Sequence, residues 1–199
     1  AADDDIQSLV QWATAVGIGC GSGGDALIKQ KLRAVLSCGK PAVIDADGLN
    51  NLDDELKKLL SLRHVLTPHP GEMARLTGKS IEDVLRDPVG FAENTAKAFG
   101  CIVLLKGAVS VAAHPDGRLR YNASGNPGLA KGGSGDVLTG IITALLAQGL
   151  EPFDAASAGG YIFRSSAESA LELLHERALT AGDVLNAIEK TAGITEHRN

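Results

Sequence analysis

This 199-residue chain has few aromatic residues and few cysteines, and its basic residues do not outnumber its acidic ones. Aromatic side chains make up 4% of the residues, too few to predict the stacking surfaces on which single-stranded nucleic acids bind. The formal net charge is −5 and the lysines and arginines are scattered, so we expect neither nucleic acid nor a membrane surface as a partner. The three cysteines, Cys20, Cys38 and Cys101, are widely spaced and form no metal-binding pattern, which predicts reduced thiols in the core.

Long apolar runs and targeting segments are also missing. No apolar run approaches the roughly 20 residues that a membrane-spanning helix needs, and the opening Ala-Ala-Asp-Asp-Asp lacks the basic and apolar regions of a signal peptide. No linker rich in proline, glycine or serine divides the chain, and 44% of its residues are hydrophobic, enough for one sizeable core. We therefore expect residues 1–199 to form a single domain of a cytoplasmic protein.

Predicted strands alternate with predicted helices along the chain. Short apolar runs predict strands at residues 13–19, 41–47, 64–67 and 101–106. Apolar residues at helical spacing predict helices at residues 6–12, 26–37, 72–76, 81–86, 91–99, 137–148, 154–174 and 179–188. Residues 110–121 predict a hairpin that turns at Pro115-Asp116-Gly117. This alternation indicates an α/β fold with a mostly parallel sheet, a hairpin at its edge, and a ligand crevice at the carboxyl ends of the strands.

The most informative stretch is the glycine-rich segment of residues 122–136, which leads into the helix predicted at residues 137–148. Its glycines, at positions 125, 128, 132, 133 and 135, allow the backbone to approach a ligand closely. A helix that begins there points unpaired N–H groups and the positive end of its dipole at one spot. Gly133, Ser134 and Gly135 are therefore predicted to form an anion hole for a phosphate or a developing oxyanion. The stretch matches neither the P-loop nor the dinucleotide-binding glycine pattern.

Asp136 lies where this anion site begins, and two roles are open for it. Aspartate is a good capping residue, so Asp136 can simply cap the helix, as Ser134 can. Alternatively, a carboxylate beside an anion site can take a proton from a substrate group. The five preceding glycines favour the second role, because a cap does not need them. Asp136 is therefore the predicted catalytic residue.

Other polar residues follow the predicted strands. Asp45 and Asp47 lie two apart, which on a strand would place both side chains on the same side; the alternatives are exposed loop acids or helix caps. His69 is held between two prolines at a strand end, where open α/β sheets bind ligands, although a solvated loop histidine is the commoner outcome. Lys106 ends the most hydrophobic strand, and we expect it to contact a phosphate rather than to extend into solvent.

Four motifs follow one another over nearly the whole chain. They are Asp-Ala-Asp-Gly-Leu-Asn-Asn-Leu at residues 45–52, Thr-Pro-His-Pro-Gly-Glu at 67–72, Leu-Lys-Gly-Ala at 105–108, and Asn-Pro-Gly-Leu-Ala with Gly-Ser-Gly-Asp within 126–136. In these motifs the chain resembles the ADP/ATP-dependent NAD(P)H-hydrate dehydratase family. The resemblance implies a ribokinase-like α/β fold of three layers. It also implies the family's metabolite-repair activity, which removes water from the nicotinamide ring of (6S)-NADHX or NADPHX and consumes ADP or ATP.

The resemblance also implies roles for the matching residues. Asp136 would activate the ring hydroxyl for phosphorylation, and the amides from Gly133 to Asp136 would stabilise charge on the phosphoryl group. The hydrated dinucleotide would contact Gly21, His69 and Asp136. The adenine nucleotide, with Mg²⁺ bridging its phosphates, would be held by Lys106, Gly107, Ala108, Val109, Ser110 and Gly135. A protein of this kind is expected to assemble with copies of itself.

Three features depart from the family pattern. The family's opening segment, with a strand, a glycine-rich turn and an alanine-rich helix, has no counterpart in residues 1–199. Gly-Ile-Gly-Cys-Gly at residues 17–21 replaces Gly-Pro-Gly-Leu-Gly, and Phe163-Arg164 stands where the family commonly has His-Gly. Two other functions are therefore considered. One is a small-alcohol kinase of the hydroxymethylpyrimidine or hydroxyethylthiazole type, a family that lacks the 67–72 motif; the other is a nucleotide-binding remnant without catalysis.

Overall fold

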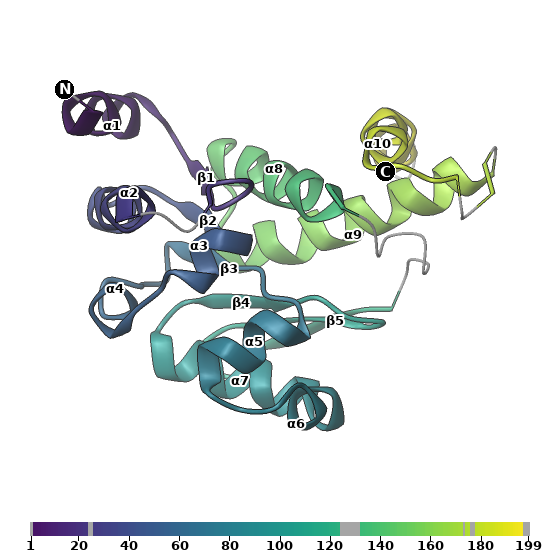
Figure 1. Ribbon diagram of the computed structural model, residues 1–199. Helices are drawn as coiled ribbons and strands as arrows, with labels where there is room; N and C mark the ends of the chain where they lie inside the picture. Colours follow the sequence, from purple (N-terminus) through teal and green to yellow (C-terminus); the bar gives the residue numbers. More distant parts are fainter. Residues whose placement is uncertain (1, 24–25, 124–131, 173, 176–177, 197–199) are drawn as a thin grey trace.

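The computed structural model describes the chain except residues 1, 24–25, 124–131, 173, 176–177 and 197–199. Within the described residues, six strands form one sheet in the order β1-β2-β3-β4-β5-β6 (Figure 1). Their bounds are Val16–Ile18, Ala42–Ile44, His64–Leu66, Ile102–Leu105, Ser110–Ala113 and Leu119–Asn122. Strands β1 to β4 are parallel, and β5 and β6 pair antiparallel at the edge. The predicted mostly parallel sheet with an edge hairpin is confirmed.

Helices cover both faces of this sheet (Figure 1). One face carries α1 (Ala2–Trp12), α2 (Ala26–Ser37), α3 (Ala46–Asn50), α4 (Asp54–Lys57), α5 (Pro70–Thr77), α6 (Ile81–Arg86) and α7 (Pro88–Phe99). The other face carries α8 (Ser134–Ala147), α9 (Pro152–Leu171) and α10 (Ala181–Glu196). The three-layer α/β/α arrangement is therefore confirmed as well.

The inner strands send alternate side chains into two separate cores, all of them buried. One set packs on the side of α8 and α9: Val43, Val65, Ile102 and Leu104. The other set packs on the side of α1 to α7: Ile44, Leu66, Val103 and Leu105. Because both faces are covered, the positions of β2, β3 and β4 are apolar with one exception, the buried His64 at the start of β3, which explains their hydrophobic runs.

Helix α9 approaches its neighbours closely through two glycines. A Cβ atom on Gly159 would lie 2.6 Å from Ile142 Cγ1 of α8, closer than any real contact. A Cβ atom on Gly160 would lie 3.7 Å from Leu104 Cδ2 of β4. The glycine pair therefore lets α9 sit in contact with both α8 and the sheet.

Three sequence predictions need correction. Strand β2 ends at Ile44, and the next residues form α3 with Asp45 as its N-cap, so Asp45 and Asp47 do not share one side of a strand. The turn from strand to helix is abrupt, because Ala46 adopts a φ of 46°. Strand β1 spans only Val16–Ile18 of the seven residues predicted. Of the cysteines, Cys101 is buried, but Cys20 and Cys38 are only partly so.

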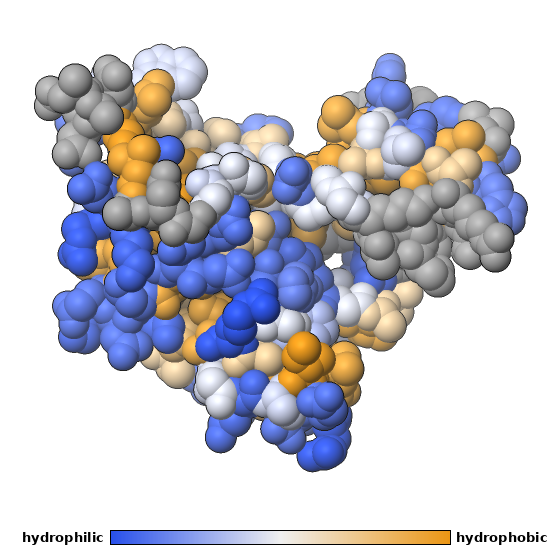
Figure 2. All heavy atoms as spheres, viewed as in Figure 1, coloured by the Kyte–Doolittle hydropathy of each residue, from blue (hydrophilic) through white to orange (hydrophobic). Residues whose placement is uncertain are grey.

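The surface over α2 and α4 is covered by hydrophilic side chains, as Figure 2 shows. No helix in the described part of the chain is long and apolar enough to cross a membrane. The predictions made for residues 124–131 of the glycine-rich segment lie outside the described residues.

Candidate active site

A cavity of about 850 Å³ opens at the carboxyl edge of the sheet. It lies between the ends of β2, β3 and β4, the first turn of α8, and the middle of α9. Its lining includes Asp45, His69, Glu72, Lys106, Gly107, Ala108, Ser110, Gly133, Ser134, Gly135, Asp136 and Arg164. The crevice predicted at the strand ends therefore exists, and it gathers residues from motifs far apart in the sequence.

The first turn of α8 presents open backbone donors to this cavity. Its N-cap is Gly133, with a φ of 84°, and it has no side-chain cap. Within the described residues, the amides of Ser134, Gly135 and Asp136 donate no hydrogen bond. The capping role considered for Asp136 and Ser134 is therefore not the one the structure shows. Such a helix start suits an anion, because its N–H groups and dipole point at the same place.

Asp136 is exposed on this first turn and lies beside Cys20 at the end of β1. Burial raises the pKa of the Cys20 thiol to about 11, and a hydrogen bond to the Asp136 carboxylate adds to the rise. The thiol therefore stays protonated near neutral pH and donates to that carboxylate. The loop after β1 is thus tied to the candidate base, which was not expected of a core cysteine.

Lys106 is held by two carboxylates, one from the N-cap of α3 and one from the first turn of α5. Its Nζ lies 2.7 Å from Asp45 Oδ1 and 3.8 Å from Glu72 Oε2. The second oxygen of Asp45 accepts a hydrogen bond of 3.0 Å from Thr139 Oγ1 on α8. Only 23% of the Lys106 side chain is exposed, so the lysine is neither extended into solvent nor alone at the sheet edge. A phosphate contact would have to share Lys106 with Asp45.

Gly135 explains why α8 can start against this ion pair. A Cβ atom on Gly135 would lie 3.2 Å from Asp45 Oδ2 and 3.7 Å from Lys106 Nζ. The first of these distances is tighter than most real Cβ contacts. Glycine therefore lets the open amides and the buried ion pair share one wall of the cavity.

His69 caps α5 and borders the cavity with half of its side chain exposed. Its Nδ1 accepts hydrogen bonds from the amides of Gly71 (2.9 Å) and Glu72 (3.3 Å), while Glu72 Oε2 accepts one from the His69 amide (2.8 Å). This reciprocal pattern is a capping box. Because Nδ1 is an acceptor, the neutral ring carries its proton on Nε2.

Most of the predicted site residues meet in this cavity, but two do not line it. Gly21, in the loop after β1, and Val109, which is 45% exposed, lie outside the lining. Three lining residues carry roles that the sequence had not suggested. Asp45 holds Lys106, Glu72 closes the capping box, and Arg164 donates to the backbone of the β4–β5 loop. Their partners are distant in sequence, so no local pattern pointed to them.

The sequence model of the NAD(P)H-hydrate dehydratase family (Carb_kinase) matches residues 2–190. The chain belongs to this family. Because the match extends over nearly the whole described chain, it covers every motif on which the resemblance was based.

Known members of the dehydratase family resemble the chain in sequence and in structure. It is 46% identical to the bifunctional NAD(P)H-hydrate repair enzyme Nnr of Moorella thermoacetica over 148 residues, covering 73% of the chain and 28% of that protein. It is 41% identical to the ADP-dependent (S)-NAD(P)H-hydrate dehydratase of Neisseria meningitidis over 177 residues, covering 85% of the chain and 60% of that protein. The chain thus spans less than two thirds of the length of these relatives.

A solved structure of a dehydratase is also similar to the chain. The ADP/ATP-dependent NAD(P)H-hydrate dehydratase of Bacillus subtilis, crystallised with ATP and Mg²⁺, superposes with a TM-score of 0.81 at 27% identity. The match covers 94% of the chain and 71% of the B. subtilis protein. Similar structures include a ribokinase-like superfamily protein, so the expected ribokinase-like fold is confirmed.

Proposed function

We propose that the chain catalyses the nucleotide-dependent dehydration of (6S)-NAD(P)HX to NAD(P)H, with ADP or ATP as the phosphoryl donor. The observation that carries the proposal is the open first turn of α8 beside Asp136, in a cavity of about 850 Å³. The names of the relatives support the reaction, since they are dehydratases or repair enzymes for the same substrate. The cavity volume falls within the range of small-molecule sites.

In this proposal the nucleotide places its phosphates over the amides of Ser134, Gly135 and Asp136. These donors would stabilise charge on the transferred phosphoryl group without having to reorganise. Lys106, whose Nζ lies 2.7 Å from Asp45 and close to Gly135, would contribute positive charge beside these amides. The remaining nucleotide contacts are expected from Gly107, Ala108, Val109 and Ser110.

Asp136 would remove the proton from the hydroxyl of the hydrated nicotinamide ring as that oxygen attacks the terminal phosphorus. The bond between that phosphorus and the bridging oxygen of the nucleotide breaks, so ADP becomes AMP. The C–O bond of the new phosphate ester then breaks, inorganic phosphate leaves with the bonding electrons, and loss of a ring proton restores the double bond of NAD(P)H. His69, fixed by its capping bonds, would hold the dinucleotide, and Gly21 would lie along its path.

The nucleotide would bring Mg²⁺ with it as the counter-ion of its phosphates. In the described part of the chain, no three His, Cys, Asp or Glu side chains gather closely enough to hold a metal ion. We therefore place Mg²⁺ on the phosphates as part of the substrate and assign it no protein ligand.

The test is absorbance at 340 nm during incubation of the protein with (6S)-NADHX, Mg²⁺ and either ADP or ATP. We expect absorbance to rise as NADH forms, and to rise only when nucleotide is present. Titration calorimetry with MgADP serves as the companion measurement. Binding without any rise in absorbance would identify a nucleotide-binding remnant and overturn the proposed catalysis.

A further inference from the structure

The loop between β4 and β5 has little backbone support of its own. Its ends are anchored, since the Lys106 amide donates to Pro68 O at 2.8 Å and Ser110 pairs with Asn122. Its middle, residues 107–109, is exposed and makes no backbone–backbone hydrogen bond to any described residue. This four-residue connection, which carries most of the proposed nucleotide contacts, is therefore held in place by something other than its own backbone.

Arg164 of α9 supplies that support. Its Nη1 donates to the carbonyl of Ala108 at 3.0 Å, and its Nη2 donates to the carbonyl of Gly107. One planar guanidinium thus binds two successive carbonyls with two different nitrogens, a geometry that a lysine cannot reproduce. Arg164 is partly buried and lines the cavity. This burial lowers its pKa from the ordinary value, while Glu168, four residues further along α9, opposes the shift.

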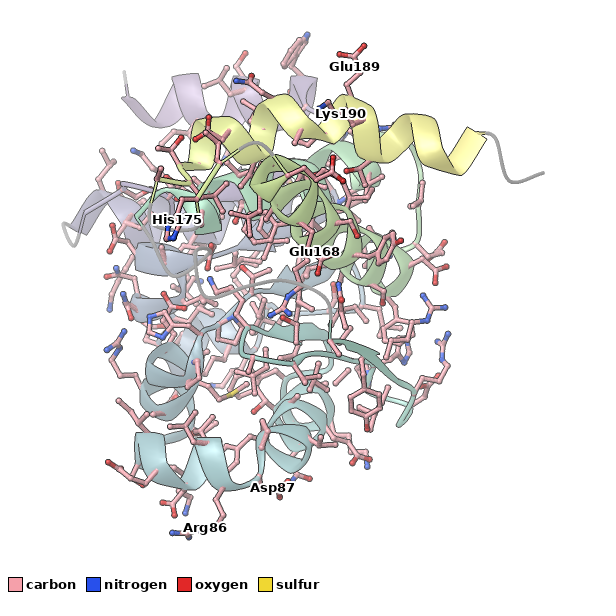
Figure 3. The ribbon with its side chains drawn as sticks, turned by 90° about the vertical axis from the view of Figure 1, so that its right-hand side faces the viewer. Arg86, Asp87, Glu168, His175, Glu189 and Lys190 are labelled. Carbon is pink, nitrogen blue, oxygen red and sulfur yellow. The ribbon has the colours of Figure 1, made fainter. Side chains whose placement is uncertain are left out.

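The position of Arg164 follows from the glycines that precede it. Gly160, four residues earlier on α9, faces Leu104 of β4, so this face of the helix lies directly against the strand that leads into the loop. The guanidinium of Arg164 therefore extends from a helix that is fixed to the sheet, so its orientation toward the loop is pre-organised. Figure 3 shows Glu168 on the same helix, and Arg86 at the far end of the molecule on α6.

We propose that Arg164 is a positioning residue for the nucleotide: it holds the β4–β5 loop in its binding conformation and thereby sets nucleotide affinity. The inference rests on the proposed function, because the loop carries the expected contacts from Lys106 to Ser110. Without Arg164, nucleotide binding would have to order residues 107–109 as well, and that entropy loss weakens binding. The dinucleotide side of the cavity, with His69, would not be affected.

The test compares Arg164→Ala and Arg164→Lys with the native protein and with Arg86→Ala. Arg86 is an exposed arginine on α6 bound to Asp83 at 3.3 Å, so its removal changes charge equally without touching the cavity. Two quantities are measured: the Kd for MgADP by calorimetry, and the backbone order parameters of residues 107–109 from ¹⁵N relaxation, which fall when a loop becomes more mobile. The KM values for nucleotide and for (6S)-NADHX are determined in parallel.

Both Arg164 variants should raise the Kd and the KM for nucleotide by roughly tenfold, about the effect of one hydrogen bond from a charged group. The backbone order parameters of residues 107–109 should fall, while the KM for (6S)-NADHX and the order parameters of α8 stay as in the native protein. Native nucleotide affinity in Arg164→Lys would show that a positive charge suffices, and would overturn the role given to the paired guanidinium hydrogen bonds. Unchanged order parameters in both variants would overturn the inference outright. If the native protein itself bound no MgADP, the proposed function would fail, whereas the order parameters would still decide whether Arg164 holds the loop.

Discussion

Helices α5 and α8 begin at the same cavity, but their first turns are built in opposite ways. At α5, His69 and Glu72 satisfy one another's backbone groups, and Pro70 at the start has no N–H to satisfy. At α8, Gly133 provides no cap, and three successive amides remain open within the described structure. The two helix starts thus differ in function. The start of α5 is closed, since its amides are capped and its side chains are fixed, whereas the start of α8 is open, since its free amides can bind an anion.

The difference follows from the residue types at the two starts. A histidine between prolines and a glutamate three residues later close α5 through side chains. Glycine at positions 133 and 135 removes the side chains that would close α8 or collide with the Asp45–Lys106 pair. A positive φ at Gly133 also costs glycine little, whereas other residues would be strained. The residue types at each helix start therefore decide whether its amides can bind an anion, as at α8, or are already capped, as at α5.

The largest expected effect is at the open start. Asp136→Asn should lower kcat by about two to four orders of magnitude, the usual range for a lost general base, while MgADP still binds. The variant retains the shape of the side chain and leaves the three amides open. Steady-state kinetics at 340 nm and calorimetry give the two numbers. A near-native kcat would mean that Asp136 does not act as the base.

The second effect concerns the ion pair behind the open start. Asp45 is 1% exposed, and Asp45→Ala would remove the carboxylate that contacts Lys106 at 2.7 Å and Thr139 at 3.0 Å. Breaking such a buried pair should lower the free energy of unfolding by about 3 kcal/mol. Urea denaturation measures it, with Lys29→Ala as control, because the Lys29–Asp53 pair is exposed and should contribute less than about 1 kcal/mol. An equal loss of unfolding free energy in the two variants would show that the buried Asp45–Lys106 pair stabilises the fold no more than an exposed pair does.

The strand that leads to the closed start carries a buried histidine, His64. Burial lowers its pKa from 6.5 to about 4, and the charge of Arg63 adds to the shift. Below pH 6.5 the unfolded chain binds a proton that the folded chain does not, so the free energy of unfolding should fall as pH drops from about 6.5 to 4. The full loss is about 3 kcal/mol.

The measurement is urea denaturation between pH 7 and pH 4 for the native protein and His64→Leu. Other groups titrate in this range, so the difference between the two proteins isolates His64. That difference should shrink or change sign in favour of the variant as pH falls. An identical pH dependence would show that His64 binds its proton equally well in the folded and unfolded states.

The smallest effect tests the closed start itself. His69→Ala removes both the cap and the imidazole, whereas His69→Asn keeps a capping side chain. Both variants should raise the KM for (6S)-NADHX and leave the Kd for MgADP unchanged, but only His69→Ala should lose about 1 kcal/mol of stability. Thermal unfolding and the two titrations separate these contributions. Weaker binding of both ligands would show that the two helix starts are not independent.

Local patterns predicted much of the fold. The bounds of α2 and α6 were predicted to the residue, because apolar spacing and capping residues act over a few positions. The glycine-rich helix start and the strand-end residues His69 and Lys106 were also found in this way. Their presence in one cavity follows from parallel strands ending at the same edge.

The contacts that complete the site could not be predicted locally. Asp45 lies 61 residues from Lys106 and 94 from Thr139, and Arg164 lies 56 from Ala108. These pairs exist only after the sheet and helices have packed. The pair Asp45 and Asp47 was misread for a related reason, since the strand period was extended past Ile44 into a helix. Tertiary packing, and not residue spacing, sets these parts of the site.

The central claim is that the open start of α8 receives the phosphates of the nucleotide, and a crystal soaked with ADP and Mg²⁺ tests it most directly. The account predicts phosphate oxygens within hydrogen-bonding distance of the amides of Ser134, Gly135 and Asp136, beside Lys106. The start of α5 should carry no ligand oxygen on its amides, since these already donate to His69. Phosphates bound elsewhere, or no nucleotide density at Gly133 to Asp136, would contradict the account.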